Sequence, residues 1–417
     1  MEAREAGHRL GMIDWLNGSA ADVALDFGGE AVRFGELARA VGSTALGTGV
    51  GPVGCPIGSD PISLVTRVLA ALHRGRPVLV GGSQREADAV ARRLPAGTQL
   101  ALLTSGSSGA SPRVVARTNE SWLASAEPLA ALAGLAADDR IAVTGPLHVS
   151  MHLYGVLHAL WVGATATDRL DGATTMHATP TRLARVLDGG AHPPAAIVAG
   201  ATLSPALRER AAARGIRLTE YYGAAELSFV LAGHDGALRP FPGVEVEARA
   251  DATGDALWAR SPYLALGVVG GGMLRRDDAG FATVGDLAER TADGGWRVLG
   301  RGDAAITTAG ATVVAESVEA RLNGLAGVRA AAVLGEPHAL LGERIVAVVE
   351  LLDGASLDEV ASAARRELPV EELPRRWFAA PVPLTAAGKV ARGALRAAMA
   401  DGALGTASAV MVERSSS

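Results

Sequence analysis

The segment Gln99-Leu-Ala-Leu-Leu-Thr-Ser-Gly-Ser-Ser-Gly109 passes from a mostly apolar run into a loop of glycine and hydroxyl side chains. The apolar run, residues 99–103, predicts a buried strand. Glycine lets the backbone after it turn so that N–H groups converge on an anion, and the hydroxyl groups add further donors. The segment therefore predicts a strand that leads into a phosphate-binding loop, with Arg113 as a nearby positive charge.

Two other interpretations of residues 104–109 stay open on this segment alone. Runs of serine and glycine are often plain flexible connections. A serine nucleophile would need Gly-x-Ser-x-Gly, and the spacing of Gly106 and Gly109 does not provide it. A Walker loop is excluded, because no Gly-Lys-Ser/Thr follows. The interpretation thus depends on what accompanies the loop.

The pattern around this loop predicts an α/β fold. Apolar runs at 77–80, 99–103, 141–145, 196–200 and 216–218 read as strands, and amphipathic stretches at 62–72, 121–135 and 205–214 read as helices. Short β-rich stretches at 244–248, 256–258 and 296–299 predict a small β subdomain. Beyond Gly300, helices at 315–325 and 357–368 and strands at 328–334 and 343–352 predict an α+β unit.

We therefore expect a large N-terminal domain of α/β sheets with a small β subdomain, followed by a small mobile α+β C-terminal domain. The expected limits are 1–300 and 301–400, with a disordered Ala/Ser-rich tail at 401–417.

Composition excludes several function classes. The net charge of −5 provides no basic field for nucleic acid or an anionic membrane. One cysteine, Cys55, cannot form an internal disulfide, which fits a reducing cytoplasm. No signal peptide and no membrane-spanning apolar run is expected. The many alanines and glycines indicate a high-GC, bacterial source.

Seven further motifs follow the loop, and in this order they resemble those of the adenylate-forming superfamily, which includes acyl- and aryl-CoA ligases, carrier-protein adenylation domains and luciferases. The motifs are Val198-Ala-Gly-Ala-Thr-Leu-Ser204, Tyr221-Tyr-Gly-Ala-Ala-Glu226, Phe241-Pro-Gly-Val-Glu245, Leu257-Trp-Ala-Arg-Ser-Pro-Tyr263, Thr283-Val-Gly-Asp286, Gly300-Arg-Gly-Asp303 and Pro383-Leu-Thr-Ala-Ala-Gly-Lys-Val-Ala-Arg392. The resemblance covers about residues 100–397 and implies ATP, Mg²⁺ and CoA as cofactors.

The resemblance also implies roles for single residues. The phosphates of ATP would contact the loop and its flanks, namely Thr104, Ser105, Gly106, Ser107, Ser108, Gly109 and Arg113. The nucleotide and acyl pockets would be lined by Gly200, Ala201, Tyr222, Gly223 and Ala225. Asp286 would bind the ribose hydroxyls, Arg301 the ribose or a phosphate, and Glu226 the Mg²⁺ ion.

Three other positions complete the implied site. His152 would lie beside the acyl pocket, and Gly310 would leave room for a pantetheine arm after the C-terminal domain rotates about Asp303. Lys389 is the one lysine in the sequence, every other cation being arginine. Its retention indicates that a compact point charge is needed at the carboxylate and α-phosphate. His148 and His152 are four residues apart, but no third zinc ligand accompanies them.

The sequence departs from the family pattern at several positions. Arg113 replaces the usual lysine after one extra residue, Ala225 replaces a threonine, and Val284 widens Thr-Gly-Asp. Thr307 and Thr312 replace basic residues that would contact CoA. The region before the loop is shorter than in typical members.

The predicted function is ATP-dependent activation of a small carboxylic acid to an acyl-adenylate, with transfer to CoA, by an acid–thiol ligase. The Phe-Asp motif by which amino-acid-activating domains hold the ammonium is not apparent at 146–155, which favours a non-amino acid. Loading of a carrier protein and a non-catalytic binding protein stay open as alternatives, as does a homodimer. Neither nucleic acid nor a membrane is an expected partner.

Overall fold

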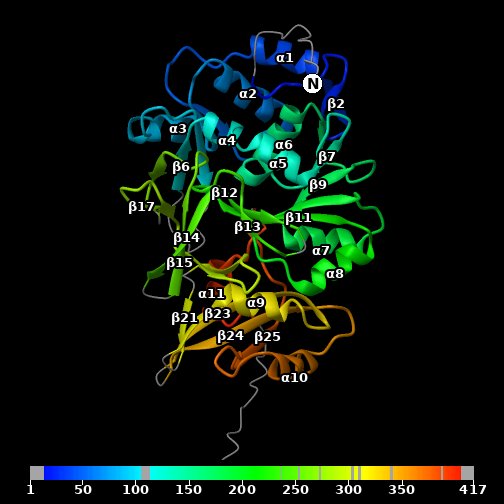
Figure 1. Ribbon diagram of the computed structural model, residues 1–417, viewed down its shortest axis with the longest axis vertical. Helices are drawn as coiled ribbons and strands as arrows, with labels where there is room; N and C mark the ends of the chain where they lie inside the picture. Colours follow the sequence, from blue (N-terminus) through cyan, green and yellow to red (C-terminus); the bar gives the residue numbers. More distant parts are fainter. Residues whose placement is uncertain are drawn as a thin grey trace, which may run out of the picture. The chain divides into compact units, whose positions relative to one another are not determined.

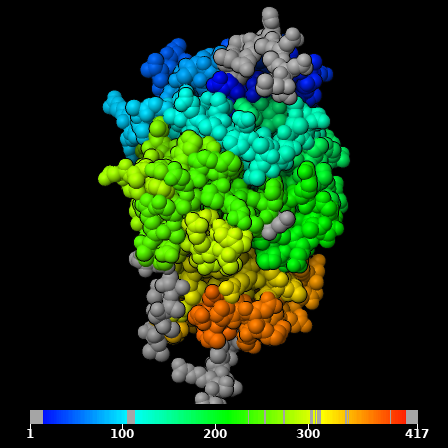
Figure 2. Space-filling model, in the orientation of Figure 1, coloured from blue at the N-terminus to red at the C-terminus, as the bar shows by residue number. Residues whose placement is uncertain are grey.

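The computed structural model describes residues 14–104, 113–234, 236–251, 254–271, 274–301, 305–308, 311–338, 341–386 and 388–404 (Figure 1). These residues fall into two compact units. Unit 1 comprises the described residues of 14–104, 113–177 and 263–271, and unit 2 those of 178–262 and 272–404. Figure 2 shows one face of the molecule in space-filling form, coloured along the sequence as in Figure 1.

Unit 1 holds two groups of hydrogen-bonded strands. In the first, the order is β9-β7-β8-β1-β2, with β9, β7, β8 and β1 parallel. In the second, the order is β16-β6-β5-β4-β3. Their bounds are β1 Val23–Phe27, β2 Glu30–Arg33, β3 Val53–Pro56, β4 Val78–Gly81, β5 Leu100–Thr104, β6 Arg113–Arg117, β7 Arg140–Val143, β8 Thr165–Thr167, β9 Thr175–Ala178 and β16 Gly267–Val269.

Among the helices of unit 1, α2 begins at a side-chain N-cap. For α2, Asp60 accepts a hydrogen bond from Ser63 N at 2.8 Å, and Pro61 occupies the first turn, where its missing N–H costs nothing. Eight residues of α2 are buried, as its apolar spacing predicts. The bounds are α1 Phe34–Ser43, α2 Pro61–His73, α3 Gln84–Val90, α4 Glu120–Leu123, α5 Ala126–Ala133 and α6 Ser150–Val162.

The single helix predicted for residues 121–135 is wrong. The chain forms α4 and α5 instead, with a break at Ala124 and Ser125. Pro128 explains the break, because proline lacks the N–H that a continuous helix would donate to Ala124, whereas it fits the first turn of a new helix. The Ser125 hydroxyl lies 2.6 Å from Trp122 O and 2.8 Å from the Tyr154 hydroxyl, so the break is buried and hydrogen-bonded.

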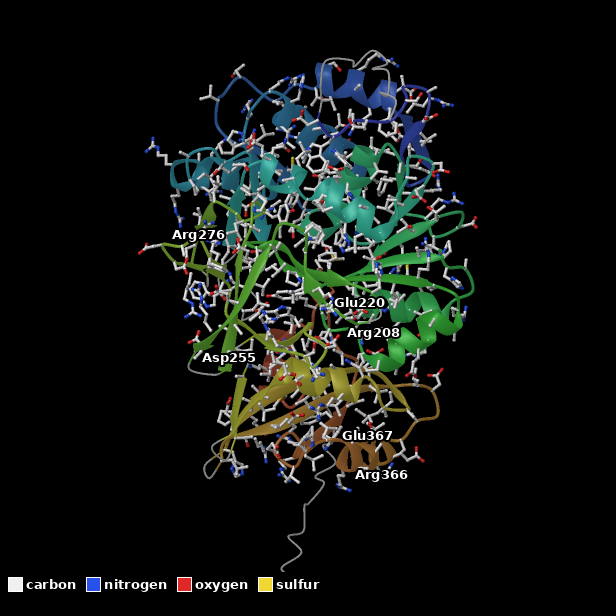
Figure 3. The ribbon with its side chains drawn as sticks, viewed as in Figure 1. Arg208, Glu220, Asp255, Arg276, Arg366 and Glu367 are labelled. Carbon is white, nitrogen blue, oxygen red and sulfur yellow. The ribbon has the colours of Figure 1, made fainter. Side chains whose placement is uncertain are left out.

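Unit 2 begins with a strand group in the order β13-β12-β11-β10, accompanied by α7 and α8. Strands β10 and β11 are parallel, and β11 and β12 form an antiparallel hairpin. Arg208 on α8 holds Glu220 on β11 with bonds of 2.6 and 2.8 Å (Figure 3). The bounds are α7 Pro180–Asp188, β10 Ala195–Val198, α8 Pro205–Ala213, β11 Arg217–Ala224, β12 Ser228–Gly233 and β13 Arg239–Pro240.

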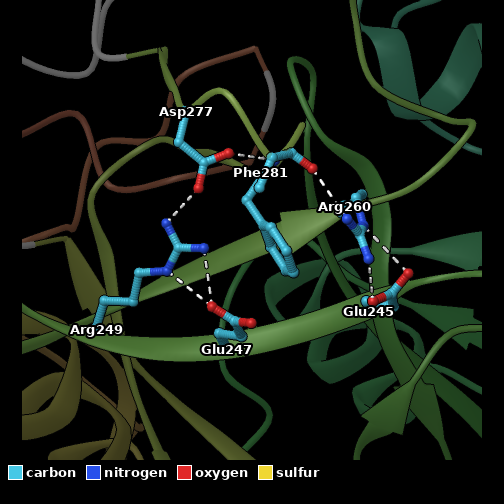
Figure 4. A network of polar contacts seen from close by, with 7 residues as sticks. Glu245, Glu247, Arg249, Arg260, Asp277 and Phe281 are labelled. Carbon is cyan, nitrogen blue, oxygen red and sulfur yellow. Dashed lines mark hydrogen bonds and ion pairs between the residues drawn. The ribbon is translucent and has the colours of Figure 1, made fainter.

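The β subdomain predicted after residue 240 is an antiparallel sheet in the order β17-β18-β15-β19-β20, and β14 pairs with β15. Charged side chains cover β14: Arg249 reaches Glu247 at 2.8 Å and Asp277 at 2.6 Å (Figure 4). Such charges protect an edge strand from pairing with another chain. The bounds are β14 Glu245–Asp251, β15 Gly254–Arg260, β17 Arg275–Arg276, β18 Ala282–Thr283, β19 Asp286–Arg290 and β20 Trp296–Arg301.

The C-terminal part of unit 2 is a mixed sheet, β22-β21-β24-β23 with β25 beside β24. Alternate residues of β23 and β24 face two apolar clusters, one holding Val333 and Ala347 and the other Leu334 and Val346. This period-2 pattern lets the sheet bury both faces. The bounds are β21 Ala305–Thr308, β22 Ala311–Val314, α9 Ala315–Leu322, β23 Val328–His338, β24 Gly342–Leu351, α10 Leu357–Glu367, β25 Arg376–Ala379 and α11 Arg392–Ala400.

Replacement of Gly54 by alanine should destabilise unit 1. A Cβ at Gly54 on β3 would lie 2.5 Å from Gln84 N, while Gly54 N–H already donates to Gln84 Oε1 at 2.9 Å. Helix α3 must therefore shift, and we expect the free energy of unfolding to fall by about 1–3 kcal/mol in urea titrations. Gly42→Ala is the control, because nothing lies within 4 Å of its Cβ. An unchanged unfolding midpoint for Gly54→Ala would contradict this close packing.

Candidate active site

The β11–β12 hairpin presents Tyr222 and Glu226, which the sequence placed at the nucleotide and the metal. Glu226 lies in the turn between the two strands and is 8% exposed. Gly223 makes the turn possible, because a Cβ there would overlap the carbonyl oxygen of Ser228. Ser228 itself has φ +59, a conformation that few non-glycine residues adopt. The hairpin is therefore held in one shape, with Ala225 beside Glu226 in its turn.

A hydrogen bond joins this hairpin to the β subdomain. The Tyr222 hydroxyl donates to Asp286 Oδ2 at 2.6 Å. Asp286 is the first residue of β19 and lies opposite Arg301 in the β19–β20 register. Only the backbone of Arg301 is described. The structure thus brings together three predicted nucleotide-binding positions that are 64 and 15 residues apart in sequence, 222 with 286 and 286 with 301.

Two glycines approach Thr179, a residue that the sequence motifs do not single out. It precedes α7, where its side chain accepts a hydrogen bond from Arg182 N at 3.3 Å. A Cβ at Gly200 (φ +96) would lie 3.4 Å from Thr179 Cγ2, and one at Gly388 (φ +73) would lie 2.9 Å from Thr179 Oγ1. The end of β10 and the residue before Lys389 therefore both approach one side chain. Thr179-Pro180 is a helix-start signature that could have drawn attention to this position.

Lys389 belongs to a hydrogen-bonded turn, here called the lysine turn (the described residues 384–386 and 388–390). Leu384 and Val390 form a β-bridge, and Thr385 N donates to Lys389 O at 2.7 Å. Lys389 N donates to Thr385 Oγ1 at 3.2 Å. Lys389 is exposed, as is Ala201 after Gly200. The turn fixes the backbone of the lysine and leaves its side chain accessible.

The residues on either side of the predicted phosphate loop belong to two paired strands of unit 1. Thr104 ends β5, Arg113 begins β6, and the two are partners in the antiparallel register. The Thr104 hydroxyl donates to Arg113 O at 3.3 Å. The predicted loop residues Ser105, Gly106, Ser107, Ser108 and Gly109 lie outside the described residues, as do Asp303 and Gly310.

His152, the predicted acyl-pocket residue, is one of three buried histidines in unit 1. Its ring lies against Gly145, where no side chain would fit. Burial lowers the pKa of His152 to about 4, of His158 to about 4 and of His177 to about 3. His158 Nε2 lies 2.8 Å from Ala126 O, whereas both ring nitrogens of His177 lack a hydrogen-bond partner among the described residues. All three rings are therefore neutral at physiological pH.

The described residues contain no group of three or more His, Cys, Asp and Glu side chains that could hold a metal ion. This arrangement still fits Mg²⁺ at Glu226, because Mg²⁺ keeps most of its waters and is held by one or two carboxylates together with substrate phosphates. The buried Glu226 carboxylate is the residue that would supply one such ligand. In the same described part of the chain, no helix has both the length and the apolar character needed to cross a bilayer.

This chain is similar to a known domain family and to several curated proteins. Residues 317–389 match the AMP-binding enzyme C-terminal domain. The acyl-CoA ligase YhfT of Bacillus subtilis is 28% identical over 329 residues, covering 70% of this chain and 67% of YhfT. A probable 2-succinylbenzoate–CoA ligase of Mycobacterium tuberculosis is 34% identical over 211 residues, 48% of this chain. The chain spans about two thirds of the first relative and 53% of the second.

Solved structures share the fold. ATP-bound MatB from Rhodopseudomonas palustris superposes with a TM-score of 0.74 at 20% identity, covering 91% of this chain and 96% of MatB. The predicted fold class is thereby confirmed, with a large N-terminal and a small C-terminal domain. The domain limits at 300 and 400 stay predictions.

The resemblance to the adenylate-forming superfamily is confirmed at the level of similarity: residues 317–389 match the AMP-binding enzyme C-terminal domain, and the curated relatives are acid–CoA ligases. More particularly, its named homologues are acyl-CoA and 2-succinylbenzoate–CoA ligases, which are AMP-forming acid–thiol ligases. The site residues of this chain are predictions that these comparisons leave untested.

The buried histidines predict acid sensitivity of unit 1. An unfolded histidine titrates near pH 6.5, so between pH 6.5 and 4 the unfolded chain binds more protons than the folded one, and stability falls as the pH drops. His177→Leu should make this dependence shallower in urea unfolding measured from pH 8 to 4.5. Replacement of the exposed His73 by glutamine should leave the slope unchanged. If stability depends on pH as steeply in His177→Leu as in the wild type, His177 does not contribute to the acid sensitivity.

Proposed function

We propose that this chain activates a small carboxylic acid with ATP and transfers the acyl group to CoA. In the first step a carboxylate oxygen attacks the α-phosphorus, the bond to the β-phosphate oxygen breaks, and pyrophosphate leaves. In the second step the CoA thiol, losing its proton, attacks the acyl carbon, and AMP leaves with the electron pair of the broken C–O bond. The observation that carries the proposal is the close approach of Gly388, the residue before Lys389, to Thr179, which Gly200 also approaches.

The first step joins two anions, so the protein must neutralise charge and align the reacting groups. Lys389 would place its ammonium at the carboxylate and α-phosphate. Asp286, fixed by Tyr222, would accept hydrogen bonds from the ribose hydroxyls, and Arg301 would contact ribose or phosphate. Glu226 would hold Mg²⁺, which supplies positive charge to the phosphates when bound.

The proposal also covers the acceptor of the acyl group and the residue that contacts the acid. CoA is favoured because the named homologues are CoA ligases, and a carrier-protein phosphopantetheine is the alternative. Gly310 would leave room for the pantetheine arm in either case. His152 would contact the acid, and its neutral ring would not hold a second positive charge there. The single cysteine suits a cytoplasmic enzyme.

ATP–pyrophosphate exchange tests the first step directly. The chain is incubated with ATP, Mg²⁺, labelled pyrophosphate and a panel of aliphatic, aromatic and dicarboxylic acids, and we expect acid-dependent label in ATP. Adding CoA or a phosphopantetheinylated carrier protein then identifies the acceptor by thioester formation. If ATP binds without exchange for every acid, the chain is a binding protein and the catalytic proposal is wrong.

Lys389→Ala should separate the two half-reactions. Adenylation requires the ammonium in the first pose, whereas the thiol attack on a preformed acyl-adenylate does not. We expect exchange to fall by about 10²-fold or more, comparable with the loss of one transition-state charge donor, while thioester formation from supplied acyl-adenylate is retained. Arg366→Ala, an exposed change on α10 (Figure 3), is the control. Equal loss of both half-reactions would contradict the role given to Lys389.

A further inference from the structure

Arg392 lies three residues beyond Lys389, at the first position of α11, and makes a strong set of ion pairs. Its Nη2 lies 2.7 Å from both carboxylate oxygens of Glu319, and its Nη1 lies 3.1 Å from Glu316 Oε1. The side chains of Arg392 and Glu319 are only 12% and 10% exposed. Removing one partner of a pair shielded from water in this way is costly, because it leaves an uncompensated buried charge.

Glu319 binds the Arg392 guanidinium and is itself held in place by the protein backbone. It is on α9, and its Oε1 also accepts a hydrogen bond from Val333 N on β23 at 2.8 Å. Burial raises the pKa of Glu319 to about 7, and the adjacent Arg392 opposes that rise. The guanidinium is therefore tied to the α9–β23 layer, which packs around the apolar cluster of Val318, Leu322 and Val333.

Glu316, the second carboxylate paired with Arg392, lies against β20, the strand whose Arg301 pairs with Asp286. A Cβ at Gly300 (φ +133) on β20 would lie 2.6 Å from Glu316 Oε2, so the carboxylate packs directly on the strand backbone. Gly300 precedes Arg301, whose backbone pairs with Asp286. A continuous path thus runs from the lysine turn through Arg392 and Glu316 to the strand pair that holds Asp286.

We propose that Arg392 is a positioning residue, which through Glu316 and Glu319 holds the lysine turn where Lys389 reaches the nucleotide. This inference rests on the proposed function, since it assigns the geometry of Lys389 in adenylation. The fold does not depend on Arg392 alone, because Leu395 of α11 is buried in an apolar cluster with Val346 and Phe378. Loss of the guanidinium should therefore loosen the lysine turn without unfolding the domain.

The experiment compares Arg392→Ala, Arg392→Lys and the control Arg396→Ala, an exposed arginine one turn along α11. We expect Arg392→Ala to lower kcat for ATP–pyrophosphate exchange by about 10- to 100-fold, the loss typical of misplaced catalytic groups, with a smaller change in KM for ATP. Thioester formation from supplied acyl-adenylate should be retained. Arg392→Lys should recover part of the exchange, because it keeps the charge but not the paired geometry.

A second readout needs no turnover. Lys389 is the one lysine, so its modification by an amine-reactive ester can be followed at a single site by mass spectrometry. ATP with Mg²⁺ should protect Lys389 in the wild type and in Arg396→Ala, and protect it much less in Arg392→Ala. Protection lost only in Arg392→Ala supports the inference even if the wild type exchanges no pyrophosphate, a result that would refute the proposed function alone.

Three results would overturn the inference. Wild-type exchange in Arg392→Ala would show that Lys389 does not depend on this arginine. Equal loss of both half-reactions, with a lowered melting temperature and no rescue in Arg392→Lys, would assign a merely structural role. Undiminished ATP protection of Lys389 in Arg392→Ala would exclude positioning irrespective of activity.

Discussion

The hydrogen bond from the Tyr222 hydroxyl to Asp286 is the contact on which the geometry of the candidate site in unit 2 depends. It joins a hairpin to a separate β sheet, and each side is rigid for its own reason. The hairpin cannot change shape easily because the chain passes so close to itself at Gly223. Asp286 is held by its backbone pairing with Arg301. A short bond between two rigid elements defines the distance between the turn with Glu226 and the β19–β20 strand pair.

The other parts of this site lie close together at places where a glycine backbone approaches a side chain. Gly200 and Gly388 both contact Thr179, and Gly300 contacts Glu316. All three glycines have a positive φ, which strains any larger residue, and at Gly300 and Gly388 an added Cβ would also collide with its neighbour. The relation between the lysine turn, the end of β10 and the β subdomain is thus set by packing of backbone against side chains.

Local pattern predicted much of this fold. The spacing of apolar residues gave α2 and α8 within one or two residues, and the apolar runs gave β5 and β10. The missed features depend on long-range contacts. The break before α5 follows from a proline whose effect a periodicity count does not register. Thr179 and Glu319 gained their importance from neighbours more than seventy residues away, Gly388 and Arg392, which no local window contains.

The candidate site residues were predicted by resemblance, which supplies positions without supplying contacts. Nothing in Tyr221-Tyr-Gly-Ala-Ala-Glu226 says that the second tyrosine bonds to a carboxylate 64 residues later. The pairing of Asp286 with Arg301 likewise appears only when β19 and β20 form a hairpin. Sequence order thus predicts which residues belong to one site, and the tertiary structure shows which of their atoms meet.

Arg392 and Lys389 lie three residues apart but differ in burial and in the partners that suit each cation. Arg392 faces carboxylates at fixed distances, and a planar guanidinium with several donors suits partners that do not move. Lys389 lies exposed on a turn and would have to follow a phosphorus centre whose bonds change during the reaction. An ammonium on a flexible stem, with charge concentrated at one atom, suits that task better than a rigid fork. Every other basic side chain of this length in the chain is arginine. In the proposed role, the one lysine would act where its partner moves, whereas the arginine three residues on faces partners that are fixed.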